Sequence, residues 1–314
     1  MFRSLLALHD LSESSRRALQ WALRFGEQFR SRLTVLSVIP PVGPPPGVSG
    51  TGPAENQLTE LTRLIRTEID KDLRACSVGA PEGRLGGLEV VIATGRPLAI
   101  ILKRILDGSP DLVFVGTHGR KGLSRAFLGS VAEKVVRHSP SPVFVARKAP
   151  QWPPQAVLIP ADVAEPPDEA LALATRLRET LPFRVDLLSV LSSPDLMEAF
   201  PEAFAGYSPV DERVLKRKAL DALKALAARY PALGLTPHLA SGPVAAEIGH
   251  AAEEFQSDFI LMPTHGRAGV GRFFLGSVAE QVVRYAPCSV LSVCPSKAAP
   301  YRKKVATEWM EAEP

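Results

Sequence analysis

The chain has 314 residues, of which 46% are hydrophobic and 22% are charged, and its formal net charge is +4. This composition excludes a disordered or fibrous chain and is typical of a globular protein long enough for two domains. Apolar runs stay well below the roughly 20 residues that cross a bilayer, so we expect no membrane association.

The amino-terminal sequence MFRSLLALHDLSESS has a short apolar run that stops at Asp10 and lacks a small-residue cleavage site, so we expect a cytoplasmic protein. Three scattered cysteines, Cys76, Cys288 and Cys294, form neither a disulfide framework nor a zinc site. Residues 1–150 contain 21 Lys and Arg against 13 Asp and Glu, whereas residues 151–314 contain 16 against 20. The positive first half favours an anionic partner.

Short apolar runs alternate with helical periodicity along the first half. The runs predict strands over residues 5–8, 33–39, 88–92, 112–115 and 143–145, and their near-continuous hydrophobicity indicates burial on both faces. Helical spacing between them marks apolar faces through Leu19, Ala22, Leu23 and Phe29, through Leu61, Leu64, Ile65 and Ile69, through Ile100, Ile101 and Ile105, and through Val131 and Val135. The alternation predicts a mostly parallel sheet with right-handed crossovers.

The second half repeats the first, with strands predicted over residues 157–159, 185–190, 237–240, 259–262 and 290–293. THGRKGLSRAFLGSVAEKVVR (117–137) and THGRAGVGRFFLGSVAEQVVR (264–284) are identical at 16 of 21 positions, at an offset of 147 residues. At the same offset Asp111 corresponds to Asp258 and Gly95 to Gly242, while residues 4–10 match 156–162 at an offset of 152. A whole α/β domain is therefore duplicated.

We place the first domain at residues 1–147, a proline-rich linker that can carry no helix at 148–155, the second domain at 156–295 and a charged tail at 296–314. Insertions at residues 40–53 and 192–210 follow the second predicted strand of each half. We expect a surface loop for the first and a partner contact for the second, with a lid as the alternative for either.

A glycine-marked segment follows the fourth predicted strand. It runs from Gly116-Thr-His-Gly119 through nine residues to Gly129-Ser130, where a predicted helix begins. Glycines allow backbone N–H groups to approach an anion, and a helix N-terminus favours negative charge. Arg120, Lys121 and Arg125 add cations between the two ends. The alternative is a tight strand-to-helix connection, but recurrence in both halves favours anion binding.

This pattern, with an aspartate just past the first strand, resembles the universal stress protein family, once per half and over nearly the whole chain. The resemblance implies two tandem open parallel five-stranded sheets flanked by helices, an α/β fold of the adenine nucleotide α-hydrolase-like, Rossmann-like kind. For one branch of the family it also implies bound ATP, alone or with Mg²⁺. The matching positions are Asp10 beside the nucleoside, the backbone of Val38 at adenine, and Gly116, His118, Gly119, Arg120, Gly129, Ser130 and Val131 around the phosphates.

The second half carries the matching residues Asp162, Val190, His265, Gly266, Arg267, Gly276, Ser277 and Val278. There Pro263 replaces the first motif glycine and removes an N–H donor. Together with the negative charge of this half, the substitution predicts a weaker second site. In the first half, Leu8-His9 stands where the family often has a small residue or proline, which alters the expected adenine wall.

The leading function is an ATP-binding regulatory or stress-response module with little or no catalysis, because neither a Walker A Lys-Ser pair nor a carboxylate pair for magnesium is found. Slow ATP hydrolysis and a scaffold with vestigial motifs stay open. His118 and His265 either contact phosphate or shape the loop, and the remaining histidines are treated as structural. Nucleic-acid binding is disfavoured, because the basic residues lack interleaved aromatics.

The resemblance also implies pairing through the last strand of each half, residues 143–145 and 290–293, as a pseudo-dimer within one chain. A homodimer of two chains stays open.

Overall fold

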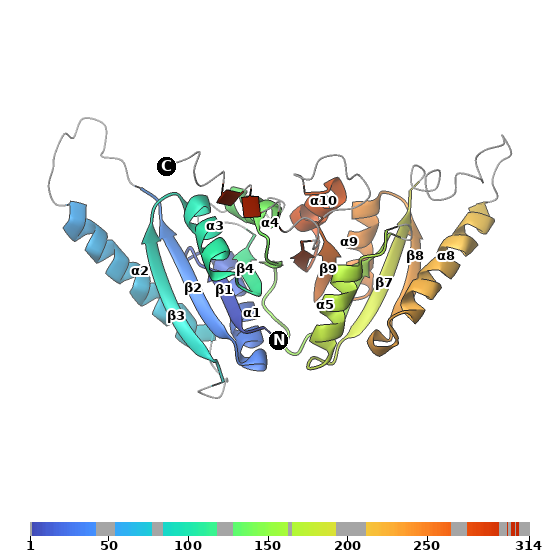
Figure 1. Ribbon diagram of the computed structural model, residues 1–314, viewed down its shortest axis with the longest axis horizontal. Coiled ribbons are helices and arrows are strands. Elements are labelled where there is room, and N and C mark those ends of the chain that lie inside the picture. The colour runs from blue at the N-terminus through green and yellow to red at the C-terminus, as the bar shows by residue number, and fades with distance from the viewer. Residues whose placement is uncertain are drawn as a thin grey trace. The chain divides into compact units, whose positions relative to one another are not determined.

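The computed structural model describes residues 2–41, 54–76, 84–117, 128–162, 165–192, 212–264 and 275–294, with residues 300, 303–304 and 306–307 of the tail. The chain divides into two units (Figure 1). One comprises Met1–Ala149 and Pro300–Pro314, and the other comprises Pro150–Ala299.

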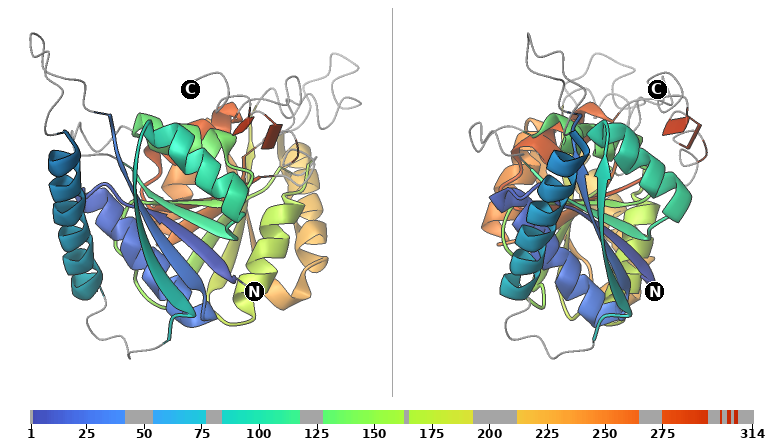
Figure 2. Two further views of the ribbon diagram at one scale, coloured as in Figure 1. Left: turned by 60° about the vertical axis from the view of Figure 1, so that its left-hand side comes forward. Right: turned by 90° about the vertical axis from the view of Figure 1, so that its left-hand side faces the viewer.

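The first unit is a parallel sheet covered by helices on both faces. Its elements are β1 (Ser4–Leu8), α1 (Glu13–Phe29), β2 (Arg32–Ile39), α2 (Ala54–Cys76), β3 (Gly87–Thr94), α3 (Pro97–Gly108), β4 (Leu112–Gly116), α4 (Ser130–His138) and β5 (Val143–Ala146). The strand order is β3-β2-β1-β4-β5, with every pair parallel. Figures 1 and 2 show α1 and α2 on one face and α3 on the other, where α3 packs against α4. The direction of winding therefore reverses between β1 and β4.

The second unit repeats this order as β10-β9-β6-β7-β8, again all parallel. Its elements are β6 (Ala156–Pro160), α5 (Asp168–Arg178), β7 (Arg184–Leu191), α8 (Glu212–Ala228), the 3₁₀ turn η1 (Pro231–Leu233), β8 (Thr236–Ser241), α9 (Val244–Glu254), β9 (Phe259–Pro263), α10 (Ser277–Tyr285) and β10 (Ser289–Val293). The predicted strands are confirmed, each within two residues of its predicted ends.

The duplication extends to single hydrogen bonds. The carboxylate of Asp111 accepts from the backbone N–H groups of Arg3 and Ser4 at 2.6 and 3.0 Å. Asp258 accepts from Gln155 and Ala156 at the same two distances. Each aspartate thus anchors the start of the first strand of its unit to the start of the fourth.

Burial on both faces is wrong for the outer strands. Leu88, on β3, is 48% exposed, because β3 and β8 each pair with one strand of their unit and are incompletely covered by helices. The predicted face of α2 is also corrected. Leu61 and Leu64 are exposed, whereas Ile65 and Ile69 are buried, so α2 packs through its later turns.

Candidate functional site

Three predicted site residues lie at one edge of the first sheet. Asp10 follows β1, Val38 is the last residue but one of β2, and Gly116 ends β4. β1 lies between β2 and β4, and the winding reverses beside it. Open parallel sheets bind ligands beyond the carboxyl ends of their strands at such a switch point. The topology therefore places these residues where a ligand is expected.

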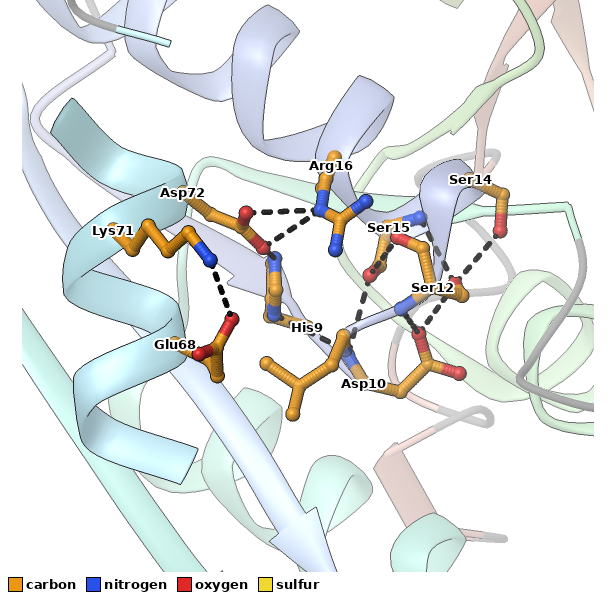
Figure 3. Close-up of polar contacts among 10 residues, drawn as sticks. His9, Asp10, Ser12, Ser14, Ser15, Arg16, Glu68, Lys71 and Asp72 are labelled. Carbon is orange, nitrogen blue, oxygen red and sulfur yellow. Dashed lines mark hydrogen bonds and ion pairs between the residues drawn. The ribbon is translucent and has the colours of Figure 1, made fainter. Parts of the chain in front are cut away.

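The turn between β1 and α1 is organised by short polar side chains (Figure 3). The Oδ1 atom of Asp10 accepts from the Ser12 N–H at 3.1 Å and from the Ser12 hydroxyl at 2.5 Å. Ser12 in turn caps α1, because its hydroxyl accepts from the Ser15 N–H at 3.2 Å. The start of α1 is thus closed by its own serine.

Gly116 packs directly against the first turn of α1. A Cβ atom added to Gly116 would lie 2.6 Å from the carbonyl carbon of Ser14 and 2.7 Å from its carbonyl oxygen. Backbone atoms cannot retreat from such a contact as the end of a flexible side chain can. Gly116 is therefore required by packing, independently of the predicted approach of an anion.

The second unit differs at the position of Ser14. At the offset of 152 residues Ser14 corresponds to Pro166, which precedes α5, whereas Ser14 lies within α1. Ser14, whose backbone requires glycine at position 116, thus has no helical counterpart in the second unit.

Replacing Gly116 with alanine should lower the free energy of unfolding by about 1–3 kcal/mol, the usual cost of overpacking. Urea unfolding followed by circular dichroism measures the change. The matched control is Gly108→Ala at the end of α3, where nothing lies within 4 Å of the added Cβ. We expect this control to be neutral or slightly stabilising. Equal midpoints for the two variants would contradict the packing role of Gly116.

The two ends of the predicted anion loop, which we call the loop base, are joined by the same backbone hydrogen bond in both units. The Gly129 N–H donates to the Thr117 carbonyl at 2.6 Å, and the Gly276 N–H donates to the Thr264 carbonyl at 2.9 Å. Each glycine is the N-cap of the helix that follows, α4 or α10, and makes no side-chain capping bond. The two ends of each loop therefore meet at the carboxyl end of a strand and the N-terminus of a helix.

The residues that open α4 are accessible from solvent. Ser130 is exposed and Val131 half-exposed, and Ser277 and Val278 of α10 are placed alike. Asp162 follows β6, and Val190 lies near the end of β7, so the second unit gathers its predicted residues at the corresponding edge. His118, Gly119 and Arg120, like His265, Gly266 and Arg267, lie outside the described residues.

Next to the β1–α1 turn lies an ionic cluster of two buried residues, His9 and Asp72, and the exposed Arg16, which the sequence did not predict (Figure 3). The side chain of His9 is 0% exposed, and its Nε2 atom lies 3.3 Å from Oδ2 of Asp72 on α2. The Nε atom of Arg16 donates to both Asp72 carboxylate oxygens at 2.9 Å. One feature of the sequence could have indicated a buried carboxylate here. Asp72 lies on the same helical face as the apolar residues Ile65, Ile69 and Leu73, which recur every three or four positions along α2.

The cluster also affects the nearest cysteine. Burial raises the pKa of the Cys76 thiol, and the negative charge of Asp72 raises that pKa further. The thiol is therefore protonated at neutral pH and is a poor nucleophile. Cys288 and Cys294 are buried.

Over the described part of the chain, His, Cys, Asp and Glu side chains form no group of three or more that could hold a metal ion. The helices within the same residues include none that is long and apolar enough to span a bilayer.

Comparison with known proteins finds the same duplication. The Universal stress protein family matches twice, at residues 1–147 and 154–293. Universal stress protein E of Salmonella typhi is 26% identical over 258 residues, which cover 79% of this chain and 78% of that protein. A protein of unknown function from Pseudomonas aeruginosa PAO1 has a similar fold, with a TM-score of 0.66 at 17% identity over 98% of both chains. A universal stress protein from Archaeoglobus fulgidus gives a TM-score of 0.64 at 22% identity, over 92% of this chain and 97% of that one.

Proposed function

Since the chain belongs to the universal stress protein family, we propose that its first unit binds ATP and that the protein acts as a regulatory, stress-response module with little or no catalysis. One observation carries the proposal. The ends of the glycine-marked loop meet, through the Gly129–Thr117 hydrogen bond, at the carboxyl edge of β4 and next to the winding reversal. That is where a parallel sheet and a helix N-terminus both favour a phosphate group.

The geometry supports a division of roles within the site. The N–H groups of Ser130 and Val131, in the first turn of α4, bind phosphate oxygens, and the Ser130 hydroxyl adds a donor. Asp10, held by Ser12, accepts hydrogen bonds from the nucleoside sugar. The backbone of Val38 faces adenine from β2. His118, Gly119 and Arg120 complete the phosphate loop in this proposal.

A Mg²⁺ ion that arrives with ATP would be held mainly by phosphate oxygens and water. The excess of basic over acidic residues in residues 1–150 favours the nucleotide further. The second unit forms a weaker site in this proposal, with Asp162, Val190, Gly276, Ser277 and Val278 in the corresponding roles, together with His265, Gly266 and Arg267. A cytoplasmic location is part of the same proposal.

The number of ATP molecules per chain tests the proposal. Isothermal titration of the full chain with ATP should give one tight equivalent. ATP at a hundredfold excess over its Kd should stabilise the folded chain by about 2.7 kcal/mol. Two equal equivalents would contradict the inequality of the units. No binding and no shift in melting temperature would instead favour a scaffold with vestigial motifs.

Phosphate release separates a binding module from an enzyme. A binding module should turn over ATP far more slowly than a typical enzyme, whose kcat is about 10 per second. Turnover near that rate would reject the proposed lack of catalysis.

Pairing through the last strands, within one chain or between two, stays a prediction that native mass spectrometry and cross-linking can test.

A further inference from the structure

The turn that carries Asp10 contains a residue in an uncommon backbone conformation. Leu11 has a φ of 65°, in the left-handed region, which is disfavoured for residues other than glycine, asparagine and aspartate. The conformation matters because Leu11 links Asp10 to Ser12, which is hydrogen-bonded to the Asp10 carboxylate. Some interaction must hold Leu11 there for Asp10 to keep its direction.

His9 supplies such an interaction. Its Nδ1 atom accepts a hydrogen bond from the Leu11 N–H at 3.3 Å. An imidazole nitrogen that accepts is unprotonated, so the proton of the neutral ring is on Nε2. That nitrogen lies 3.3 Å from the Asp72 carboxylate, which favours the proton at this position.

Asp72 is itself fixed in place. It is 7% exposed, and both of its carboxylate oxygens accept from Arg16. The neighbouring charges on α2, Lys71 and Glu68, pair with each other at 3.6 Å (Figure 3). The ring of His9 is therefore held by α2 on one side and supports the β1–α1 turn on the other.

The second unit lacks this arrangement. At the offset of 152 residues Ala161 stands at the position of His9, and it has no polar side-chain atom. The backbone hydrogen bond at this position is the same in both units, because the N–H groups of His9 and Ala161 donate to the carbonyls of Leu36 and Leu188 at 2.9 and 2.7 Å. The second unit therefore offers no imidazole acceptor at this position.

We propose that His9 is a positioning residue of the nucleotide site: its Nδ1 atom holds Leu11 in the left-handed conformation that directs Asp10, and Asp72 keeps the ring in the tautomer that allows this. The inference rests on the proposed function, since Asp10 is the residue that contacts the nucleoside. It adds a second cause for unequal ATP binding by the two units, besides Pro263.

Two substitutions distinguish the roles of the two ring nitrogens of His9. In His9→Asn the side-chain oxygen takes the place of Nδ1 and still accepts from Leu11, but the side chain is too short to reach Asp72. In His9→Gln the side-chain amide takes the place of Nε2 beside Asp72, but the acceptor beside Leu11 is lost. His250→Asn is the control, because His250 lies on α9 of the second unit and its side chain is 72% exposed.

The experiment measures the Kd for ATP by titration calorimetry and the amide exchange of a peptide that contains Leu11 and Ser12, in the full chain. We expect His9→Asn and His250→Asn to stay within about threefold of the wild-type Kd. His9→Gln should bind at least about tenfold more weakly, with faster exchange in the turn, the size of effect that a lost hydrogen bond near a charged group produces. The ring nitrogen shifts of unsubstituted His9 should show an unprotonated Nδ1 and a protonated Nε2.

Equal affinities for His9→Asn and His9→Gln, or a protonated Nδ1 in the wild type, would overturn the role of His9 while ATP binding itself stands. A wild-type chain that binds no ATP would instead overturn the proposed function. The ring shifts need no substitution, so they decide the tautomer even if a variant fails to fold.

Discussion

Replacing Phe25 with alanine should lower the free energy of unfolding of the first unit by about 3–5 kcal/mol, the usual cost of deleting a buried aromatic ring. Phe25 is fully buried on α1, and its ring lies 5.5 Å from that of Phe114 on β4 and 6.0 Å from that of Phe144 on β5. Neighbouring backbone can only partly fill the cavity left behind. Hydrogen exchange followed by mass spectrometry measures the loss peptide by peptide.

The matched substitution in the second unit is Phe183→Ala. Phe183 is 1% exposed, and its ring lies 6.4 Å from that of Phe259. If each unit has its own core, each substitution should accelerate exchange only in the unit that contains it. Equal acceleration in both units after either substitution would show that the chain unfolds as one cooperative body.

Most of the fold was predictable because its signals are local. Each strand is a short apolar run, and each helix is marked by apolar residues at a spacing of three or four, so their alternation predicts a parallel sheet. The duplication lets the same fold be predicted twice, once from each half. Asp111 and Asp258 confirm that the two halves correspond, because each accepts the same backbone hydrogen bonds.

What the sequence missed depends on contacts between distant residues. The pairing of His9 with Asp72 joins positions on β1 and α2 that nothing local connects. Likewise, the packing reason for Gly116 appears only when Ser14 of α1 is seen against the end of β4. The exposure of Leu61 and Leu64 was missed for a related reason, because periodicity gives the apolar face of a helix but not the length over which it packs.

The two candidate sites share the loop base but differ around the aspartate. The loop base is common to both, since the Gly129–Thr117 and Gly276–Thr264 hydrogen bonds are alike. The residues around the aspartates differ, with His9 before Asp10 and Ala161 before Asp162. If the base of the glycine-marked loop determined the affinity for ATP, the two units would bind ATP equally. If the turn around the aspartate determines it, the first unit binds ATP more tightly.

Replacing Asp10 with alanine should weaken ATP binding to the chain by about 10–100-fold, because hydrogen bonds to a charged group contribute about 1.5–3 kcal/mol. The substitution removes the acceptor for the nucleoside and also the Oδ1 atom that holds Ser12. Titration calorimetry of the full chain measures the change in Kd for the tight equivalent.

Two further substitutions show which of these losses matters. Asp10→Asn keeps an oxygen that accepts from Ser12 but removes the negative charge, so its Kd should lie between those of the wild type and Asp10→Ala. Asp162→Ala removes the corresponding carboxylate of the second unit and should leave the tight equivalent unchanged. If Asp162→Ala instead weakens the tight equivalent while Asp10→Ala does not, ATP binds chiefly in the second unit, and neither Pro263 nor Ala161 disfavours it there.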